Sequence, residues 1–213
     1  MARPKSPLLS REQILRAALA QIDATGSLGL PKLARDLNVG TSSLYHHFKG
    51  GREEVVESIR GLLSSEGMPC EREPGESWQD FTRRWAGAYR TAFAAHPAAV
   101  PLMTAQTVSH PATLASYEVL AEVLHEAGFG DDELLHAVTV LDCFILGSAL
   151  DAGSPVEVWA ARGDGESRLA RAIAAARAQP GDRAERAFRL GLESLLSGLS
   201  ALLERDCAER VFG

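Results

Sequence analysis

The sequence of 213 residues predicts an all-α protein of two domains, residues 1–64 and 65–213. Apolar residues recur at helical spacing along most of the chain, and no segment alternates as a half-buried strand does. Residues 65–77 collect two glycines and two prolines between helical segments, which is typical of a linker. A composition of 46% apolar and 23% charged residues excludes a collagen-like chain and general disorder.

Four helices are predicted in the first domain. Ser10 is a suitable N-cap for the first of them, and Gly26 ends it. Pro31 falls in the first turn of the second helix, where proline is tolerated. Thr41 or Ser42 is expected to cap the third. The first expected helix follows Ser10, and the second spans about Leu30 to Leu37. The third ends at Phe48, and the fourth spans about Arg52 to Ser64.

The second domain is predicted to contain longer helices. Ser77 is a suitable N-cap for the first of them, and Pro97 and Pro101 interrupt the chain after it. A connection rich in glycine, alanine and charge is expected at 153–183, with one short helix inside it. The first expected helix spans about 78–96, and a shorter helix is expected to continue from it to about 107. The others span about 111–127, 133–152, 166–177 and 184–204.

Residues 30–48 have the spacing of a helix-turn-helix, whose second helix fits a major groove of DNA. Leu33 and Ala34 are expected to face inward from the first helix, and Leu44 and Phe48 from the second. Asn38 falls at the turn, where a positive φ is expected that asparagine tolerates well. The alternative is an ordinary pair of helices in which residues 41–43 only form a cap.

The outward side chains of the second helix suit contact with DNA. Short hydroxyl groups lie at its N-terminus, aromatic and imidazole groups follow, and basic groups come last. Hydroxyl, phenol and imidazole groups reach phosphates or base edges, whereas lysine and arginine contact phosphates. The candidate DNA-binding residues are Lys32, Thr41, Ser42, Ser43, Tyr45, His46, His47, Lys49 and Arg52.

Charge is distributed unevenly along the chain, although the formal net charge is −6. Residues 1–52 contain eight basic and three acidic residues, a net +5, and all three lysines of the chain. The remainder contains 14 basic and 25 acidic residues, a net −11. A basic module on an acidic body indicates one surface for a polyanion such as double-stranded DNA.

Cysteine usage and hydropathy indicate a cytoplasmic, nucleoid-associated protein without a membrane partner. Cys70, Cys143 and Cys207 are odd in number and lack C-x-x-C spacing, which argues against a disulfide framework or a zinc ribbon. No apolar run is expected to reach the roughly 20 residues of a membrane helix. The basic N-terminus lacks the apolar segment of a secretory signal.

The motifs in both domains resemble one family. The segment from Ser10 to about Leu62 resembles the DNA-binding domain of the TetR family of bacterial repressors, and the run Leu44–Lys49 resembles its recognition-helix signature. Asn38 departs from the usual glycine but holds the same turn. Segments in the second domain resemble the ligand-binding domain of the tetracycline-repressor branch: 75–81, 124–129 and 144–151.

The resemblance implies a ligand-responsive transcriptional regulator, a repressor that binds a near-palindromic operator as a homodimer. Each subunit would place one recognition helix in successive major grooves. The C-terminal domain would bind a small molecule and dimerise. Such a molecule releases DNA only if it binds the spread state more tightly than the DNA-competent state.

The ligand site is expected to differ from that of the branch. The histidine and glutamate that hold a drug–magnesium chelate there fall at about Met103 and Asp151, and a thioether is no ligand for magnesium. A polar asparagine falls at Trp85. We therefore expect an aromatic or apolar effector and no metal or cofactor. The candidate ligand-binding residues are Trp85, Tyr89, Met103, Gln106 and Asp151; alternatively, Trp85 and Met103 are plain core.

Two apolar helix faces are predicted to form a four-helix bundle with a second subunit. Alternatively, both faces are used inside one subunit. The first face contains Leu134, Leu135, Val138, Leu141, Ile145, Gly147 and Ser148, and the second contains Phe188, Leu192, Leu195, Leu196, Leu199, Leu202 and Leu203.

A helical di-iron carboxylate enzyme is the main competing hypothesis. It would use two E-x-x-H motifs, Glu122 with His125 and Glu133 with His136, plus further glutamates from two other helices. The motifs flank the break at 128–130 instead of lying at matched depth, so no enzyme is expected. A helical ligand-binding module without DNA binding is the other alternative, and a DNA-binding assay separates it from a regulator.

Overall fold

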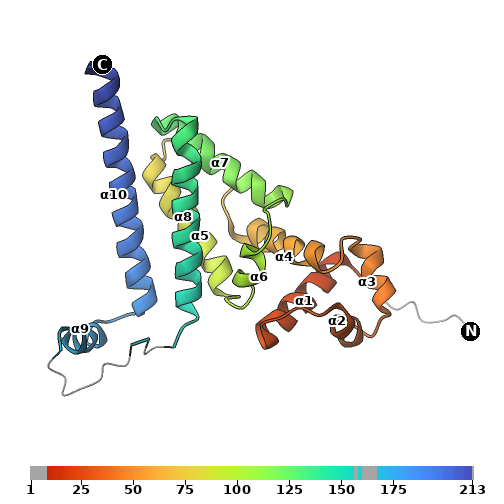
Figure 1. Cartoon of the computed structure of the whole chain (residues 1–213). Coiled ribbons are helices and arrows are strands. Elements are labelled where there is room, and N and C mark those ends of the chain that lie inside the picture. The colour runs from red at the N-terminus through yellow and green to blue at the C-terminus, as the bar shows by residue number, and fades with distance from the viewer. Residues whose placement is uncertain (1–8, 156–157, 160–166, 213) are drawn as a thin grey trace, which may run out of the picture.

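The computed structural model describes residues 9–155, 158–159 and 167–212, with side chains up to residue 205. This part of the chain is helical without strands, which confirms the all-α prediction (Figure 1). Its helices are α1 (Arg11–Thr25), α2 (Leu30–Asp36), α3 (Thr41–His47), α4 (Gly51–Gly67), α5 (Trp78–Ala94), α6 (Val100–Thr104), α7 (Pro111–Ala127), α8 (Asp131–Ala152), α9 (Arg168–Arg177) and α10 (Arg183–Phe212).

Helices α1 to α3 form a small head at one end of the molecule, and α8 and α10 lie side by side at the other (Figure 1). Helix α4 connects the two parts, because it packs on α1 in the head and on α5, α6 and α7 in the body. The division into residues 1–64 and 65–213 stays a prediction, since α4 contributes packing surface to both sides.

The local signals in the head act mostly as predicted. Ser10 and Gln13 form a reciprocal capping box at α1, and Gly26 ends that helix with φ 68°. Asn38 has φ 53° and is the one non-glycine residue with positive φ in the described part of the chain. The predicted cap of α3 is wrong: Gly40 occupies the N-cap position in extended conformation, and no side chain caps the helix.

Several helix ends differ from the sequence prediction. Helix α4 continues beyond Ser64 to Gly67 and α10 beyond Glu204 to Phe212, because no proline or glycine follows early enough to stop either. Helix α6 ends at Thr104 instead of about 107. Helix α9 begins at Arg168 with Ser167 as its cap, and Glu166 lies outside the described residues.

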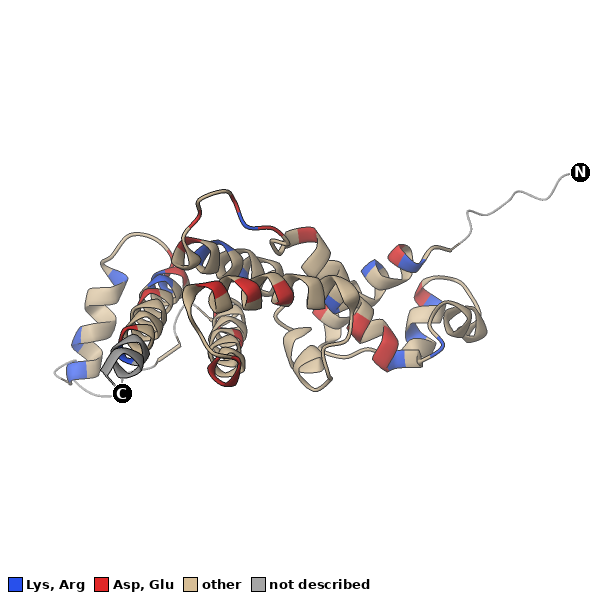
Figure 2. Ribbon diagram, turned by 90° about the horizontal axis from the view of Figure 1, so that it is seen from above, with Lys and Arg blue, Asp and Glu red and all other residues tan. Residues whose placement is uncertain are grey.

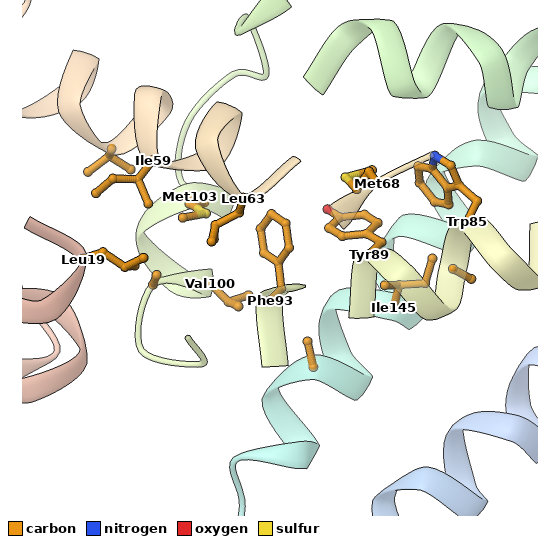
Figure 3. Packing of buried hydrophobic residues seen from close by; sticks show 14 of the residues in the cluster. Leu19, Ile59, Leu63, Met68, Trp85, Tyr89, Phe93, Val100, Met103 and Ile145 are labelled. Atoms are coloured by element: carbon orange, nitrogen blue, oxygen red, sulfur yellow. The ribbon is translucent and has the colours of Figure 1, made fainter. Parts of the chain in front are cut away.

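One continuous apolar core extends from the head into the body. In Figure 3, Leu19 of α1 faces Ile59 and Leu63 of α4 on one side, and Tyr89, Trp85 and the α8 helix lie on the other. Phe93 of α5 lies between these groups (Figure 3). Because the core is not interrupted at α4, a change of packing in the body reaches the head through contiguous side chains.

Helix α8 corrects one expectation from the sequence. By length and composition it could cross a membrane, whereas no segment of this kind was expected. Only 22% of its most apolar window is buried in this structure. The helix packs on α5, α7 and α10 through one side, so its apolar character divides between a packed face and an exposed face.

Candidate DNA interface and ligand site

The recognition helix α3 is held against α2 by a tight turn. The amide of Val39 donates to the carbonyl of Ala34 at 2.9 Å, and Ala34 is buried where the helices meet. Leu44 and Phe48 are buried beneath α3. This anchoring turns the opposite side of α3 outward, as the helix-turn-helix spacing predicts.

The outward face of α3 presents most of the predicted DNA-binding side chains. Ser42, Tyr45, His46 and Lys49 are exposed, and the side chain of Tyr45 is 50% exposed, which is high for a large aromatic residue. Thr41, Ser43, His47 and Arg52 are half-buried. The hydroxyl groups of residues 41–43 form no hydrogen bond within the described residues, since α3 does not use them as caps.

The predicted basic DNA contacts differ in whether their side chains already have a partner within the protein. Lys49 forms no ion pair within the part of the chain that the structure describes. Lys32 pairs with Asp36 at 2.6 Å, and the Nε of Arg52 donates to the carbonyl of Leu28 at 3.2 Å. Arg35, on the exposed side of α2, is likewise unpaired among the described residues and was missed by the sequence analysis.

Arg11 fixes the end of α3, a role that sequence reasoning missed. Its guanidinium donates to the carbonyl of His47, pairs with Glu54 at 3.2 Å and lies 4.1 Å from the centre of the Phe48 ring. The backbone amide of Gly50 and Arg11 together lower the pKa of Glu54. One residue of α1 therefore contacts both the end of α3 and α4.

A buried ion pair on α4 forms hydrogen bonds with the end of α6 and with the connection between α6 and α7. Glu57 and Arg60 are paired at 3.0 Å, and their side chains are only 12% and 7% exposed. One carboxylate oxygen of Glu57 accepts from the amides of Ser109 and His110 at 2.6 and 2.7 Å. Arg60 donates to the carbonyl of Met103, at the end of α6.

The same connection rests directly on the backbone of α4. The imidazole ring of His110 lies against Gly61, so closely that a Cβ atom at Gly61 would overlap it. The Nδ1 of His110 accepts from the amide of Ala112 and caps α7. One turn further along α4, the hydroxyl groups of Ser64 and Thr113 are 3.0 Å apart in the interior. Helices α4 and α7 are thereby held at two adjacent points.

The candidate ligand-binding residues lie in three separate places. Trp85, Tyr89 and Met103 are in the core, with Met103 beside Ile59 and away from Trp85 (Figure 3). Gln106 lines a cleft of about 600 Å³ between α4 and the connection to α7. Asp151 lines another of about 640 Å³ between the end of α8, α9 and the start of α10. The structure does not bring the five together, and their ligand roles stay predictions.

Asp151 is engaged within the subunit. Its two carboxylate oxygens accept from the guanidinium of Arg183 at 2.8 and 2.9 Å. Arg183 also lies 5.6 Å from the centre of the Trp159 ring, which is exposed and lines the 640 Å³ cleft. This bidentate pair ties the end of α8 to the start of α10.

A polar cluster inside the body was missed by the sequence analysis. Tyr89 donates to Asp142 at 2.9 Å, and Tyr117 donates to the same carboxylate oxygen. Burial raises the pKa of both tyrosines well above the ordinary value, so both phenols stay protonated. The signal was an acidic residue between apolar neighbours in the middle of α8, a position at which a charge requires a partner.

The predicted dimer faces are largely used inside the subunit. Leu141 and Ile145 of α8 are buried, as are four members of the α10 set: Phe188, Leu192, Leu196 and Leu199. Phe144 stacks on Phe188 at 5.7 Å. Of the predicted set, Leu135, Gly147 and Leu202 remain exposed. The alternative that these faces pack within one subunit therefore accounts for most of them.

The di-iron hypothesis has no geometric support. Glu122, His125 and His136 are exposed around the turn between α7 and α8, and the side chain of His125 is 66% exposed. Within the described residues, no three histidine, cysteine or acidic side chains gather in an arrangement that could hold a metal ion. The four residues of the two E-x-x-H motifs thus do not form an inward-facing set.

Comparison with known proteins identifies the family. Residues 71–203 match the family model described as tetracyclin repressor-like, C-terminal domain. The tetracycline repressor protein class D from Escherichia coli is 31% identical over 211 residues, which covers 92% of this chain and 93% of the relative. The chain belongs to the tetracycline-repressor (TetR) family.

The TetR-family chain is a ligand-responsive, DNA-binding transcriptional regulator. Its fold is similar to that of ActR from Streptomyces coelicolor without ligand, with a TM-score of 0.77 at 24% identity over 94% of this chain and 99% of that one. It is also similar to a TetR variant from Acinetobacter baumannii AYE in complex with minocycline, with a TM-score of 0.70 at 22% identity over 92% and 98%.

The contact between Gly61 and His110 yields a stability prediction. Gly61→Ala should lower the melting temperature by at least about 3 °C, because overpacking costs about 1–3 kcal/mol. Gly87→Ala in α5 is the matched control: its Cβ would meet nothing within 4 Å, so it should keep or raise stability. Thermal unfolding followed by circular dichroism measures both.

A second substitution tests whether His110 causes the loss. His110→Ser removes the ring and supplies another capping side chain, so it should restore most of the stability of Gly61→Ala. If Gly61→Ala is as stable as Gly87→Ala, the close packing of the α6–α7 connection on α4 is refuted.

Proposed function

We propose that this TetR-family regulator is a repressor that binds a near-palindromic operator as a homodimer and releases it when a small aromatic or apolar molecule binds the body. The free outward face of α3 carries the proposal. Among the described residues, its hydroxyl, phenol and imidazole groups form no side-chain hydrogen bond, and Lys49, which forms no ion pair there, follows them. We place the protein in the cytoplasm, associated with the nucleoid.

Within the head, we assign two kinds of contact. Thr41, Ser42, Ser43, Tyr45, His46 and His47 choose the operator, because groups at the start of a recognition helix reach base edges. Lys49, with Lys32 and Arg52, supplies the salt-dependent part of the affinity through phosphates. The ion pair of Lys32 and the carbonyl contact of Arg52 must rearrange to do so, which makes Lys49 the strongest phosphate candidate.

The proposed dimer is supported by exposed residues that repeat at coiled-coil spacing. On α8 the exposed positions 136, 140, 143, 147 and 150 are separated by four, three, four and three residues. On α10, positions 187, 190, 194, 197 and 201 have the complementary pattern and are mostly small. Such stripes are typical of helices that pack side by side. Two helices from each subunit would form a four-helix bundle.

The route from effector to DNA runs through α4. A molecule that enters the aromatic core displaces the elements around Trp85, Tyr89 and Met103. Met103 and the α6–α7 connection are gripped by Glu57 and Arg60, so α4 must follow any shift of that connection. Because Arg11 couples α3 to α4, the two recognition helices of a dimer would change their spacing.

The proposed effector is aromatic or apolar and needs no metal. Related TetR proteins bind minocycline in one solved structure and actinorhodin in another, both multi-ring compounds. Here a thioether, Met103, stands where the branch has a histidine, and the core around Trp85 and Tyr89 is built from aromatic rings. Gln106 and Asp151 would contribute only if the clefts they line join the core when the effector enters.

Selection of binding sites from random duplex DNA tests the proposal. The purified protein should enrich a dyad-symmetric sequence whose half-sites are separated by about one helical turn. Fluorescence anisotropy should then show a large preference for this site over a scrambled duplex. Failure to bind any duplex at low salt would contradict DNA binding, and an asymmetric single site would contradict the dimer.

Two variants of the recognition helix separate its two kinds of contact. Lys49→Ala should weaken binding to all duplexes alike and reduce the salt slope by about two, one charge from each subunit, whereas Thr41→Ala should change the preference among operators. Arg168→Ala in α9 removes a charge far from the head and should change neither. A Lys49→Ala variant with altered preference but unchanged nonspecific affinity would refute the division of roles.

The dimer seam yields a matched pair of variants. Val140 on α8 and Leu114 on α7 are 46% and 47% exposed, but only Val140 belongs to the proposed seam. Val140→Arg should therefore produce a monomer in sedimentation equilibrium and lose operator affinity, because like charges would meet across the seam. Leu114→Arg should remain dimeric. A dimeric Val140→Arg protein would place the interface elsewhere.

A further inference from the structure

Asp142 is a half-buried carboxylate of the body that pairs with no cation among the described residues. It lies on α8 between the buried residues Leu141 and Ile145 at helical spacing. Its described partners are the two phenols of Tyr89 and Tyr117, and both donate to the same oxygen, Oδ1. Neutral donors stabilise a carboxylate but leave its charge in place.

Two basic groups associated with the tyrosines have partners elsewhere. Arg60, whose charge lowers the pKa of Tyr117, is paired with Glu57 and donates to backbone carbonyls. Arg90, the neighbour of Tyr89 on α5, donates to Ser148 and pairs with Glu185 at 2.7 Å. The second oxygen of Asp142 therefore has no partner among the described residues.

Aromatic rings pack against the two tyrosines that contact Asp142. Tyr89 and Tyr117 each pack edge-to-face on Trp85, with ring centres 5.2 and 5.4 Å apart, and Phe93 lies 4.7 Å from Tyr89. The rings come from α5 and α7, and the carboxylate comes from α8. Faces of aromatic rings attract cations, and the attraction is largest where water is excluded.

We propose that the effector carries a protonated amine on an aromatic ring system, and that Asp142 binds this amine between Tyr89 and Tyr117. The inference rests on the proposed function, because it names the chemistry of the effector of the same domain. The amine would donate to Asp142 in place of the two phenols. The ring system of the effector would pack against Trp85 in place of the side chains that contact it now.

The position of Tyr117 connects this site to DNA release. Tyr117 lies on α7 one turn after Thr113, which meets Ser64 of α4, and two turns after the His110 cap, which rests on Gly61. Displacing Tyr117 from Asp142 shifts the helix that holds α4 at those two points. The cationic group would thus act on α4 through α7, in addition to the contacts of α6.

Three probes with one ring system test the charge preference. 2-Naphthylmethylamine, which is protonated at pH 7, 2-naphthylmethanol and 2-naphthoate are titrated into the dimeric full chain by calorimetry without DNA. The amine should bind about tenfold more tightly than the alcohol, because a hydrogen bond between charged groups contributes more than a neutral one. The carboxylate should bind most weakly.

Two variants identify the group responsible. Asp142→Asn keeps an oxygen that accepts from both phenols, so the fold should persist while the amine loses its advantage over the alcohol. Tyr117→Phe removes one competing donor and should bind the amine as tightly as the wild type or more so. Thermal unfolding confirms that both variants are folded.

The outcomes separate this inference from the proposed function. Equal binding of amine and alcohol, no binding of any probe, or an amine preference retained in Asp142→Asn overturns the assignment and leaves Asp142 as an internal hydrogen-bond acceptor only. Operator binding, measured in parallel on the same preparation, is independent of these results. Its loss in the wild type would overturn the proposed function instead.

Discussion

The ion pair between Glu57 and Arg60 is the interaction on which the rest of the structure depends. It lies on α4, the one helix shared by head and body, and satisfies two amides and a carbonyl of the connection between α6 and α7. A buried pair of this kind contributes little net stability, because removing both charges from water costs about as much as their attraction gains. Its value is geometric: it allows one relative position of two segments and makes others costly, since each would leave a charge buried without partners.

That geometry explains why glycine occurs at Gly61. The connection must approach the backbone of α4 closely for the amides of Ser109 and His110 to reach Glu57. A side chain at position 61 would hold the two segments apart by the thickness of a methyl group. The helix accepts the lower helical propensity of glycine because the polar contacts on either side require this approach. Packing and hydrogen bonding therefore both fix the distance between the α6–α7 connection and the backbone of α4.

Sequence reasoning succeeded where the signal was local. The capping box at Ser10, the positive φ at Asn38 and the inward face of Leu33, Ala34 and Leu44 depend on residues a few positions apart. It failed where partners are distant in sequence: Arg11 meets residues 36 to 47 positions away, and Tyr89 meets Asp142 53 positions away. The apolar faces of α8 and α10 were identified, but a helical pattern does not show whether a face packs within a subunit or between two.

The candidate ligand residues lie apart for the same reason: their partners are distant in sequence. An alignment to relatives carries over positions and not the shape of the site, and Trp85 here fills space with a ring whose Nε1 is satisfied by Ser116 at 2.8 Å. Asp151 is joined to Arg183, a partner that belongs to α10 and could not be inferred from α8 alone. Only side-chain packing distinguishes a residue that lines a site from one that closes the core.

Negative charge gathers along the middle of each subunit. The basic segment lies at the head, and Figure 2 shows a row of acidic residues along the middle of the molecule, where α7 carries Glu118, Glu122 and Glu126. In the field of a DNA duplex such a molecule experiences a torque before it makes any contact. Orientations that bring the acidic middle of the body toward phosphate are disfavoured, so the head meets the duplex more often than this middle region does. The acidic part of the body thus contributes to recognition by repulsion. It disfavours encounters in which this part of the body, and not the recognition helix, faces the DNA.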